Sequence, residues 1–249
     1  MRRFGSTAAT VLAFGVAMGY LEAVVVVYLR VALGLAPGAL VPASDPAAFG
    51  TFETVEIARE LATLVMIAAV GWLAGSGGLE RLAWAAVVFG AWDIAYYGGL
   101  WVVLGWPPSL ATWDVLFLVP VAWVGPVWAP ITVSVALVGF GLAAAHRLRL
   151  GHPIAVGPVR ALAAVGGGLL VALSFVVDTD RVLSGDTSAW TGWPLFGAGM
   201  TLAGVAAASV LRHGSPDGVA GAGANDREAR VSAAIHHGPG GRPPVGSPD

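Results

Sequence analysis

The sequence predicts an all-α fold, a polytopic transmembrane helix bundle with about six spans plus one re-entrant half-helix. Composition is the first reason: the chain is 57% hydrophobic and only 11% charged, with a mean hydropathy of +0.77. An ordinary soluble domain carries roughly 25% charged residues. A soluble core built from 249 residues could not bury this much apolar surface. The lipid bilayer must therefore solvate much of the chain, and we expect it to be the main partner.

Apolar segments of sufficient length are the second reason, because a helix needs about 20 apolar residues to cross a bilayer. We predict spans at 7–29, 54–76, 81–104, 127–146, 158–177 and 193–212. The first could pass for a signal peptide, but its apolar run exceeds the roughly 7–15 residues usual for one. It also holds Glu22 and a Gly15/Gly19 pair suited to close helix packing. We expect this segment to be retained as a span.

Arginine placement predicts the orientation, because cytoplasmic loops of membrane proteins are rich in basic residues. Arg2 precedes the first span, Arg81 opens the third, and Arg147 and Arg149 end the fourth. We expect these ends, and both termini, on the cytoplasmic side of an inner (cytoplasmic) membrane. The acidic loop 178–186 is expected outside.

The chain divides into a membrane domain, 1–212, and a tail, 213–249. The tail is rich in Gly, Pro, Ala, Ser and Asp. Such a composition cannot bury enough apolar area to fold, so the tail is predicted to be disordered and cytoplasmic.

Between the third and fourth spans, residues 106–130 contain five prolines and four tryptophans. Two spans already connect the basic ends at Arg81 and Arg147, so a further full crossing between them would place the second basic end outside. We therefore predict that 112–122 dips in from outside and returns as a re-entrant half-helix, with Asp114 capping it. The alternative is an interfacial anchor, with Trp at the lipid headgroups and Pro ending the helices.

The second predicted span opens with an acidic stripe. Glu53, Glu56, Glu60 and Thr63 recur at helical spacing and share one face, and Arg59 lies beside them. Ionisable groups inside a membrane are costly unless paired or hydrated, so they are candidates for function. Acids near a helix N-terminus are also favoured by its dipole, which explains Glu53 better than Glu60. A purely structural pairing of Arg59 with a carboxylate remains an equal alternative.

Further acids fall at a similar depth on other segments. Glu22 lies in the outer half of the first span, Asp93 in the outer half of the third, and Asp114 opens the segment that follows. Tyr97 follows Asp93 by one helical turn, although Tyr also favours the headgroup level. We predict one outward-facing acidic pocket. Its candidate ligand- or ion-binding residues are Glu22, Glu56, Arg59, Glu60, Asp93, Tyr97 and Asp114.

Two strings in this central region carry a family resemblance. They are Trp-Pro…Trp-Asp-x-Leu-Phe-Leu-x-Pro…Trp-x-Gly-Pro-Val between 106 and 127, and Glu-x-x-Arg-Glu between 56 and 60. Over about the central third of the chain, they resemble a group of uncharacterised bacterial multi-pass integral membrane proteins. The resemblance implies a membrane location and no assigned activity.

Residue types that are absent narrow the chemistry. Without Cys, thiolate nucleophiles, zinc–thiolate sites and iron–sulfur clusters are excluded, and a net charge of -2 excludes a large basic surface for nucleic acid. No dinucleotide or Walker motif and no His-x-x-x-His helix is present. The sequence indicates no cofactor. The carboxylates, Arg and Tyr that remain suit a proton, a cation or a hard divalent metal, or acid–base work on a lipid.

Three functions follow from this chemistry. The first is transporter-like handling of a proton, cation or small molecule at the acidic pocket. The second is a membrane enzyme acting on a lipid or lipid-linked substrate, with the same carboxylates as acid, base or metal ligands. The third is a non-catalytic scaffold, in which the acids and Arg59 only fix the order of the helices. The sequence leaves open whether the chain is an enzyme.

Overall fold

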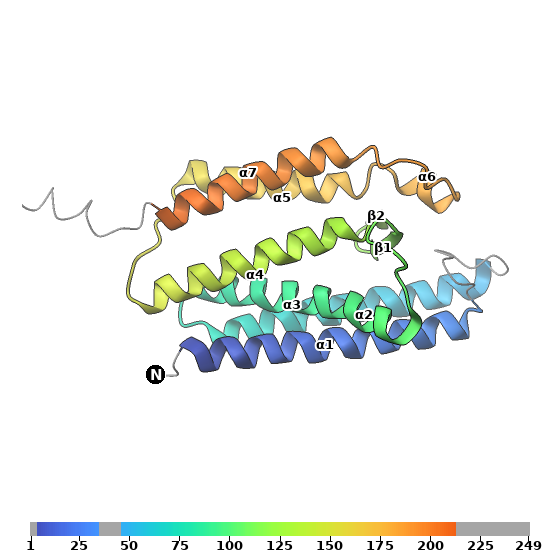
Figure 1. Ribbon diagram of the computed structural model, residues 1–249, viewed down its shortest axis with the longest axis horizontal. Helices are drawn as coiled ribbons and strands as arrows, with labels where there is room; N and C mark the ends of the chain where they lie inside the picture. Colours follow the sequence, from blue (N-terminus) through green and yellow to red (C-terminus); the bar gives the residue numbers. More distant parts are fainter. Residues whose placement is uncertain (1–3, 35–45, 213–249) are drawn as a thin grey trace, which may run out of the picture. The chain divides into compact units, whose positions relative to one another are not determined.

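A computed structural model describes residues 4–34 and 46–212, with the side chains of the second helix described from Glu53 onward, and it confirms the predicted fold class. Within the described residues, six helical segments are long and apolar enough to cross a membrane (Figure 1). The helices are α1 (Phe4–Ala32), α2 (Pro46–Ala74), α3 (Gly78–Leu104), α4 (Trp128–Arg149), α5 (Pro158–Ser174), α6 (Thr179–Leu183) and α7 (Trp193–Arg212). The short α6 continues the span that α5 begins. The predicted tail lies outside the described residues.

Helix ends agree with the predicted spans except at the start of the second helix. There, α2 begins at Pro46 rather than at residue 54. Pro suits the first turn of a helix, because it has no N–H to leave unpaired there. The stretch of α2 that is apolar enough to span a membrane begins at Glu53, so α2 starts before its apolar part does.

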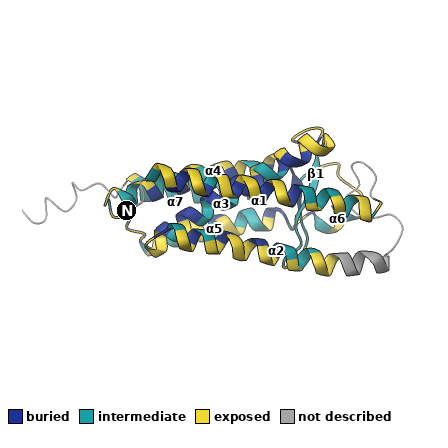
Figure 2. Ribbon diagram, turned by 90° about the horizontal axis from the view of Figure 1, so that it is seen from below, coloured by how far each residue is buried: buried dark blue, intermediate teal, exposed yellow. Residues whose placement is uncertain are grey.

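Small residues let the helices pack closely. A Cβ added at Gly15 of α1 would lie 2.8 Å from the Cβ of Ala91 on α3, so the backbones approach too closely for a larger residue. This confirms the role expected of the Gly15/Gly19 pair. At the α5–α7 contact, a Cβ on Gly167 would lie 2.6 Å from the backbone nitrogen of Ala203. Buried residues accordingly lie on the faces where helices meet, while exposed apolar residues face outward (Figure 2).

The prediction of a re-entrant half-helix over 112–122 is wrong. This segment forms an antiparallel β-hairpin from β1 (Trp113–Phe117) and β2 (Trp123–Pro126), with Asp114 opposite Gly125. Prolines before, between and within the strands remove backbone donors and break helical turns. The aromatic and β-branched residues of the strands favour an extended backbone. Asp114 therefore lies in a strand and cannot cap a helix.

Hydrogen bonds tie the hairpin to the span formed by α5 and α6. The Val124 N–H donates to the Phe175 carbonyl at 2.8 Å. The Thr179 hydroxyl donates to the Ala122 carbonyl at 2.7 Å. Backbone groups that are buried away from water, such as the N–H of the fully buried Val124, need such partners. The hairpin is thus bonded to helices that come later in the chain, as well as to α2, as shown below.

A buried ion pair joins α3 and α4 at the end of the bundle opposite the hairpin. The Arg149 Nε donates to the Glu80 Oε1 at 2.6 Å. The same guanidinium donates to the Thr7 hydroxyl at 2.8 Å and to the Ala74 carbonyl at 2.9 Å. Glu80 also accepts the backbone N–H and the hydroxyl of Ser76. One arginine therefore holds four segments together, a contact that sequence analysis did not predict.

Candidate functional site

Arg59 lies between two carboxylates of the predicted site. It forms an ion pair with Glu22 of α1, and its Nη2 lies 2.8 Å from the Oε2 of Glu56, three residues earlier on α2. Helical spacing brings residues i and i+3 onto one face, which explains the second pairing. The Glu22 side chain is only 8% exposed, so its charge needs a partner. The structure thus brings three of the predicted residues into one contact.

Glu22 is also the point where three helices meet. Its Oε2 accepts the indole N–H of Trp92 on α3 at 2.7 Å and the hydroxyl of Thr63 on α2 at 3.2 Å. Charge-assisted hydrogen bonds of this kind are stronger than neutral ones. Together with the Arg59 ion pair, these two hydrogen bonds place the Glu22 carboxylate of α1 in contact with donors from α2 and α3.

Glu60, one residue after Arg59, contacts the hairpin. Both of its carboxylate oxygens accept the Leu118 N–H, at 2.9 and 3.1 Å. The residue is 6% exposed. Among residues 4–34 and 46–212, no arginine lies within 4 Å of this carboxylate, although Arg59 is close enough to interact with it electrostatically. A buried acid therefore links α2 directly to the turn between β1 and β2.

Asp93 finds a different partner from the one expected. Arg59 is the base that lies at a similar depth in the predicted spans, but the structure places the Ser134 hydroxyl of α4 2.8 Å from the Asp93 Oδ2. Ser134 is fully buried and Asp93 is 8% exposed. Arg59 is engaged instead by Glu22 and Glu56. Asp93 is thus a buried acid whose described hydrogen-bond partner is neutral.

Tyr97 and Asp114 contact each other, one on α3 and the other on β1. The Tyr97 hydroxyl donates to the Asp114 Oδ2 at 3.1 Å. Asp114 lies outside the six spans, and burial raises its pKa to about 7, against the opposing effects of the Tyr97 hydroxyl, the Val115 N–H and the positive charge of Arg30. The negative charge of Asp93 raises this pKa further. The carboxyl group of Asp114 therefore exchanges its proton near neutral pH.

The seven predicted residues thus form linked groups rather than one contact. Arg59 joins Glu22 and Glu56, whereas the three other acids are hydrogen-bonded by neutral donors. That all seven line a single pocket stays a prediction. The contacts could be anticipated in part from the helical spacing on α2. The hairpin and Ser134 partners could not, because they depend on tertiary packing.

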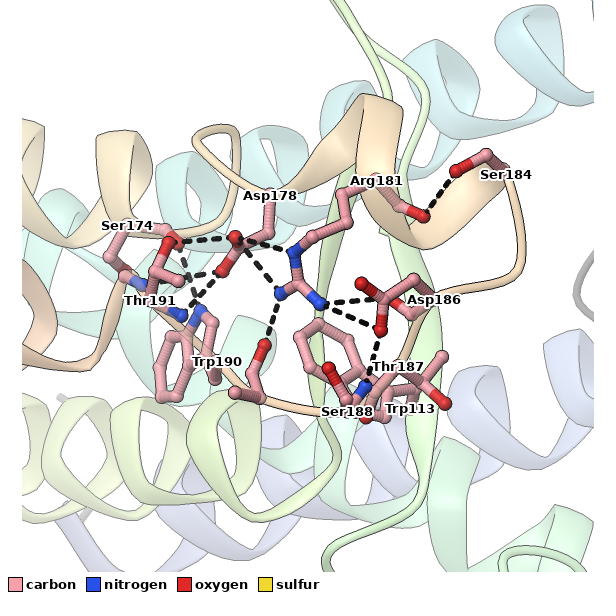
Figure 3. Close-up of polar contacts among 12 residues, drawn as sticks. Trp113, Ser174, Asp178, Arg181, Ser184, Asp186, Thr187, Ser188, Trp190 and Thr191 are labelled. Atoms are coloured by element: carbon pink, nitrogen blue, oxygen red, sulfur yellow. Dashed lines mark hydrogen bonds and ion pairs between the residues drawn. The ribbon is translucent and has the colours of Figure 1, made fainter.

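A second polar cluster lies around α6 and in the loop that joins it to α7, where the sequence indicated only an acidic exterior (Figure 3). The Arg181 guanidinium lies 3.0 Å from Asp178 and 3.3 Å from Asp186. It also donates to the carbonyl of Ala189. Asp178 in turn accepts the N–H and the hydroxyl of Thr191, each at 2.7 Å. The Asp-x-x-Arg spacing is the one signal that could have revealed this cluster.

A cavity of about 400 Å³ adjoins this cluster. Its lining comes from β1, β2, the start of α4, the loop before α7 and the start of α7, and it includes Trp113, Trp128, Trp190 and Trp193. Sequence analysis interpreted the tryptophans of 106–130 as interfacial anchors or as part of a broken backbone. The structure places two of them in the wall of a cavity.

The fold defines a multi-pass membrane protein whose environment is the lipid bilayer. Within the described residues, no group of three or more His, Cys, Asp or Glu side chains is arranged to hold a metal ion. No family model, curated protein or solved structure matches the chain.

Proposed function

We propose that this protein handles protons or small cations at the acidic residues between α1, α2, α3 and the hairpin. The observation that supports this most is the excess of acids over bases. Arg59 is shared by Glu22 and Glu56, and three more acids are held by neutral donors. Ionised carboxylates in apolar surroundings are costly, so the surplus acids must carry protons or attract cations. A site of this kind can take up and release positive charge.

Glu60 is the residue that would couple this charge to the backbone. An ionised carboxylate accepts the Leu118 N–H more strongly than a protonated one. Protonation or cation binding at Glu60 would weaken the contact between α2 and the turn of the hairpin. The state of the acid would then be sensed by the segment that covers this end of the bundle.

Orientation completes the proposal. The end of the bundle that holds Arg149 also holds Arg81 and Arg147, and the hairpin is at the opposite ends of α3 and α4. Basic ends face the cytoplasm in membrane proteins. We therefore propose that the acidic residues and the hairpin face outward, in a cytoplasmic membrane of a bacterium.

A scaffold is the second candidate, and the ion pair at Arg59 favours it. Glu22 accepts hydrogen bonds from Thr63 and Trp92 in addition to this pair, so it is saturated by internal partners. In a scaffold, neutralising Glu22 and Arg59 together is tolerated better than either change alone, and no flux depends on them.

Proton flux in proteoliposomes tests the first candidate. The full chain is reconstituted with a pH-sensitive dye inside, and valinomycin with a potassium gradient sets the membrane potential. We expect the internal pH to change faster than in protein-free vesicles, either with or without added sodium. This flux should be lost in Glu60→Gln and in Asp93→Asn. Glu53→Gln is the matched control, because Glu53 lies exposed on the same helix.

The outcomes are separable. If folded wild-type protein changes the internal pH no faster than protein-free vesicles, both with and without added sodium, the proposal is wrong and the scaffold candidate stands. If flux occurs but Glu60→Gln and Asp93→Asn behave like Glu53→Gln, the acids are structural. Gel filtration of each variant in detergent establishes that lost flux is not lost folding.

A further inference from the structure

The cavity beside the loop before α7 has walls of indole. Trp113 of β1 and Trp193 of α7 line it together with Trp128 and Trp190. The rings of Trp128 and Trp190 pack edge to face, 5.4 Å apart at 72°, and Phe175 stacks on Trp190. A volume of about 400 Å³ is ample for a small organic group. The aromatic surface left for a ligand therefore comes mainly from Trp113 and Trp193, of which Trp193 is 63% exposed.

Two of these indoles have already used their only hydrogen-bond donor. The Trp113 Nε1 donates to the Thr187 carbonyl at 3.0 Å, and the Trp190 Nε1 donates to the Ser174 carbonyl at 3.1 Å (Figure 3). An indole nitrogen carries a single N–H. What these rings can offer a ligand is thus their electron-rich surface, which attracts cations.

The segment that supplies the 187–193 side of the cavity carries a negative formal charge, although none of the described acidic residues lines the cavity itself. Residues 178–193 contain three aspartates and one arginine. That arginine, Arg181, is held by Asp178 and Asp186, while Asp180 is exposed. The Arg181 guanidinium lies 6.0 Å from the ring centre of Trp113, so one of the four indoles already has a cation near it. Three aspartates and one arginine give the segment a formal charge of -2, which favours a cation over an anion at the other indoles.

We propose that this cavity binds an organic cation, specifically a quaternary, methylated ammonium group. Such a group lacks N–H donors and is only weakly hydrated, so it needs aromatic faces and negative potential more than it needs hydrogen bonds. The cavity supplies both. The ligand would come either from a free solute or from the headgroup of a lipid, which carry the same chemistry.

This site is distinct from the acidic residues described above. Trp113 and Asp114 are consecutive in β1, and consecutive residues of a strand project to opposite faces. Asp114 reaches Tyr97 on α3, whereas Trp113 bonds the Thr187 carbonyl and lines the cavity. The hairpin therefore separates the two sites, and binding at the cavity needs no ion flux.

Equilibrium dialysis with radiolabelled choline tests the inference on the full chain in maltoside detergent. We expect saturable binding that tetramethylammonium competes and that the neutral carbon isostere, dimethylbutanol, does not. Trp193→Leu should weaken binding about threefold to thirtyfold, the range expected for one lost cation–π contact. Trp101→Leu is the matched control, since both tryptophans are 63% exposed and Trp101 lies outside the cavity.

A second pair of variants, at Ser188, tests the cavity even if Trp193→Leu does not fold. Ser188 lines the cavity, and its described hydrogen bond uses only its backbone N–H. Ser188→Arg places a competing cation in the cavity and should abolish choline binding, while Ser188→Gln should keep most of it. The inference fails if choline does not bind saturably, if dimethylbutanol competes equally, or if each variant matches its control.

Nanodiscs separate the two sources of ligand. If a lipid headgroup occupies the cavity, discs of phosphatidylcholine will suppress choline binding relative to discs of phosphatidylglycerol. If the ligand is a free solute, binding will be the same in both. Either result supports a methylated-ammonium site, and both can be obtained whether or not the protein moves ions.

Discussion

Replacing Arg149 with Gln should destabilise the protein much more than replacing Arg147 with Gln. Both residues end α4, so each substitution removes one positive charge from the same loop and changes the orientation signal equally. Arg149 is paired with the buried Glu80, whereas the Nε of Arg147 has no hydrogen-bond partner among the described residues. The comparison isolates the ion pair from the effect of net charge.

The size of the stability loss depends on the hydrogen bonds that Glu80 retains after Arg149 is replaced. Breaking a buried ion pair costs about 3–5 kcal/mol, because the remaining charge is left unpaired. Glu80 retains the N–H and hydroxyl of Ser76 and the indole N–H of Trp84. Arg149 is 21% exposed, so water screens part of the interaction. We therefore expect a loss of about 2–3 kcal/mol.

Thermal unfolding in detergent, followed by tryptophan fluorescence, measures this loss. For a chain of this size, it corresponds to a decrease in Tm of about 5–10 °C. Arg147→Gln should stay within about 2 °C of the wild type, because it breaks no ion pair of the described residues and removes a buried Nε that has no hydrogen-bond partner there. The double variant Glu80→Gln/Arg149→Gln should recover part of the loss. Equal effects of the two arginine variants, or strict additivity in the double variant, would refute the reasoning.

Three further expectations concern other contacts. Gly167→Val should lower the Tm and reduce the free energy of unfolding by about 1–3 kcal/mol, because its Cβ would meet backbone atoms of α7. Gly168→Val should not, because the space around its Cβ is open. Trp92→Phe removes a donor to a buried carboxylate and should lower the Tm more than Trp101→Phe at an exposed site, as seen by thermal unfolding. Burial raises the folded-state pKa of Asp114 to about 7, so the contribution of this residue to stability should fall as pH rises from about 4 to 7. Asp114→Asn should therefore raise the Tm more at pH 8 than at pH 4. An equal change in Tm at both pH values would contradict this.

The helices were predictable because lipid imposes a simple rule. Every backbone group in the bilayer must be paired within the chain, so long apolar segments become helices whatever packs against them. The Gly15/Gly19 pair was likewise readable, since small residues four apart mark a close helix contact. These features depend on local sequence and on the solvent, and not on distant parts of the chain.

The hairpin was not predictable in the same way. Its sequence is apolar enough to suggest a helix that dips into lipid. An even number of crossings between the basic ends at Arg81 and Arg147 was compatible with that. Its prolines and its aromatic and β-branched residues favour an extended backbone, but its position depends on donors and acceptors elsewhere: the carboxylate of Glu60, the carbonyl of Phe175 and the hydroxyl of Thr179. These groups are far away in the sequence, and nothing in residues 112–122 reveals them.

The contacts within the candidate site are also of two kinds, those that local sequence predicts and those that depend on tertiary packing. Arg59 and Glu56 are three residues apart on one helix, so their contact could be expected from spacing alone. Asp93 and Ser134 belong to different helices whose relative rotation no local pattern reports. Ser134 also has no charge to draw attention to it. Acids were therefore easier to locate than the neutral groups that accommodate them.

The dual attachment of the hairpin constrains the order in which the protein is made. A nascent chain leaves the ribosome from its N-terminus, so β2 emerges before α5. Until α5 arrives, the Val124 N–H lacks the Phe175 carbonyl that it bonds in the finished protein. An unpaired amide is costly in hydrocarbon and cheap in water. We therefore expect the hairpin to stay in water until α5 has been made, so that the end of the bundle that holds the hairpin closes late in biogenesis.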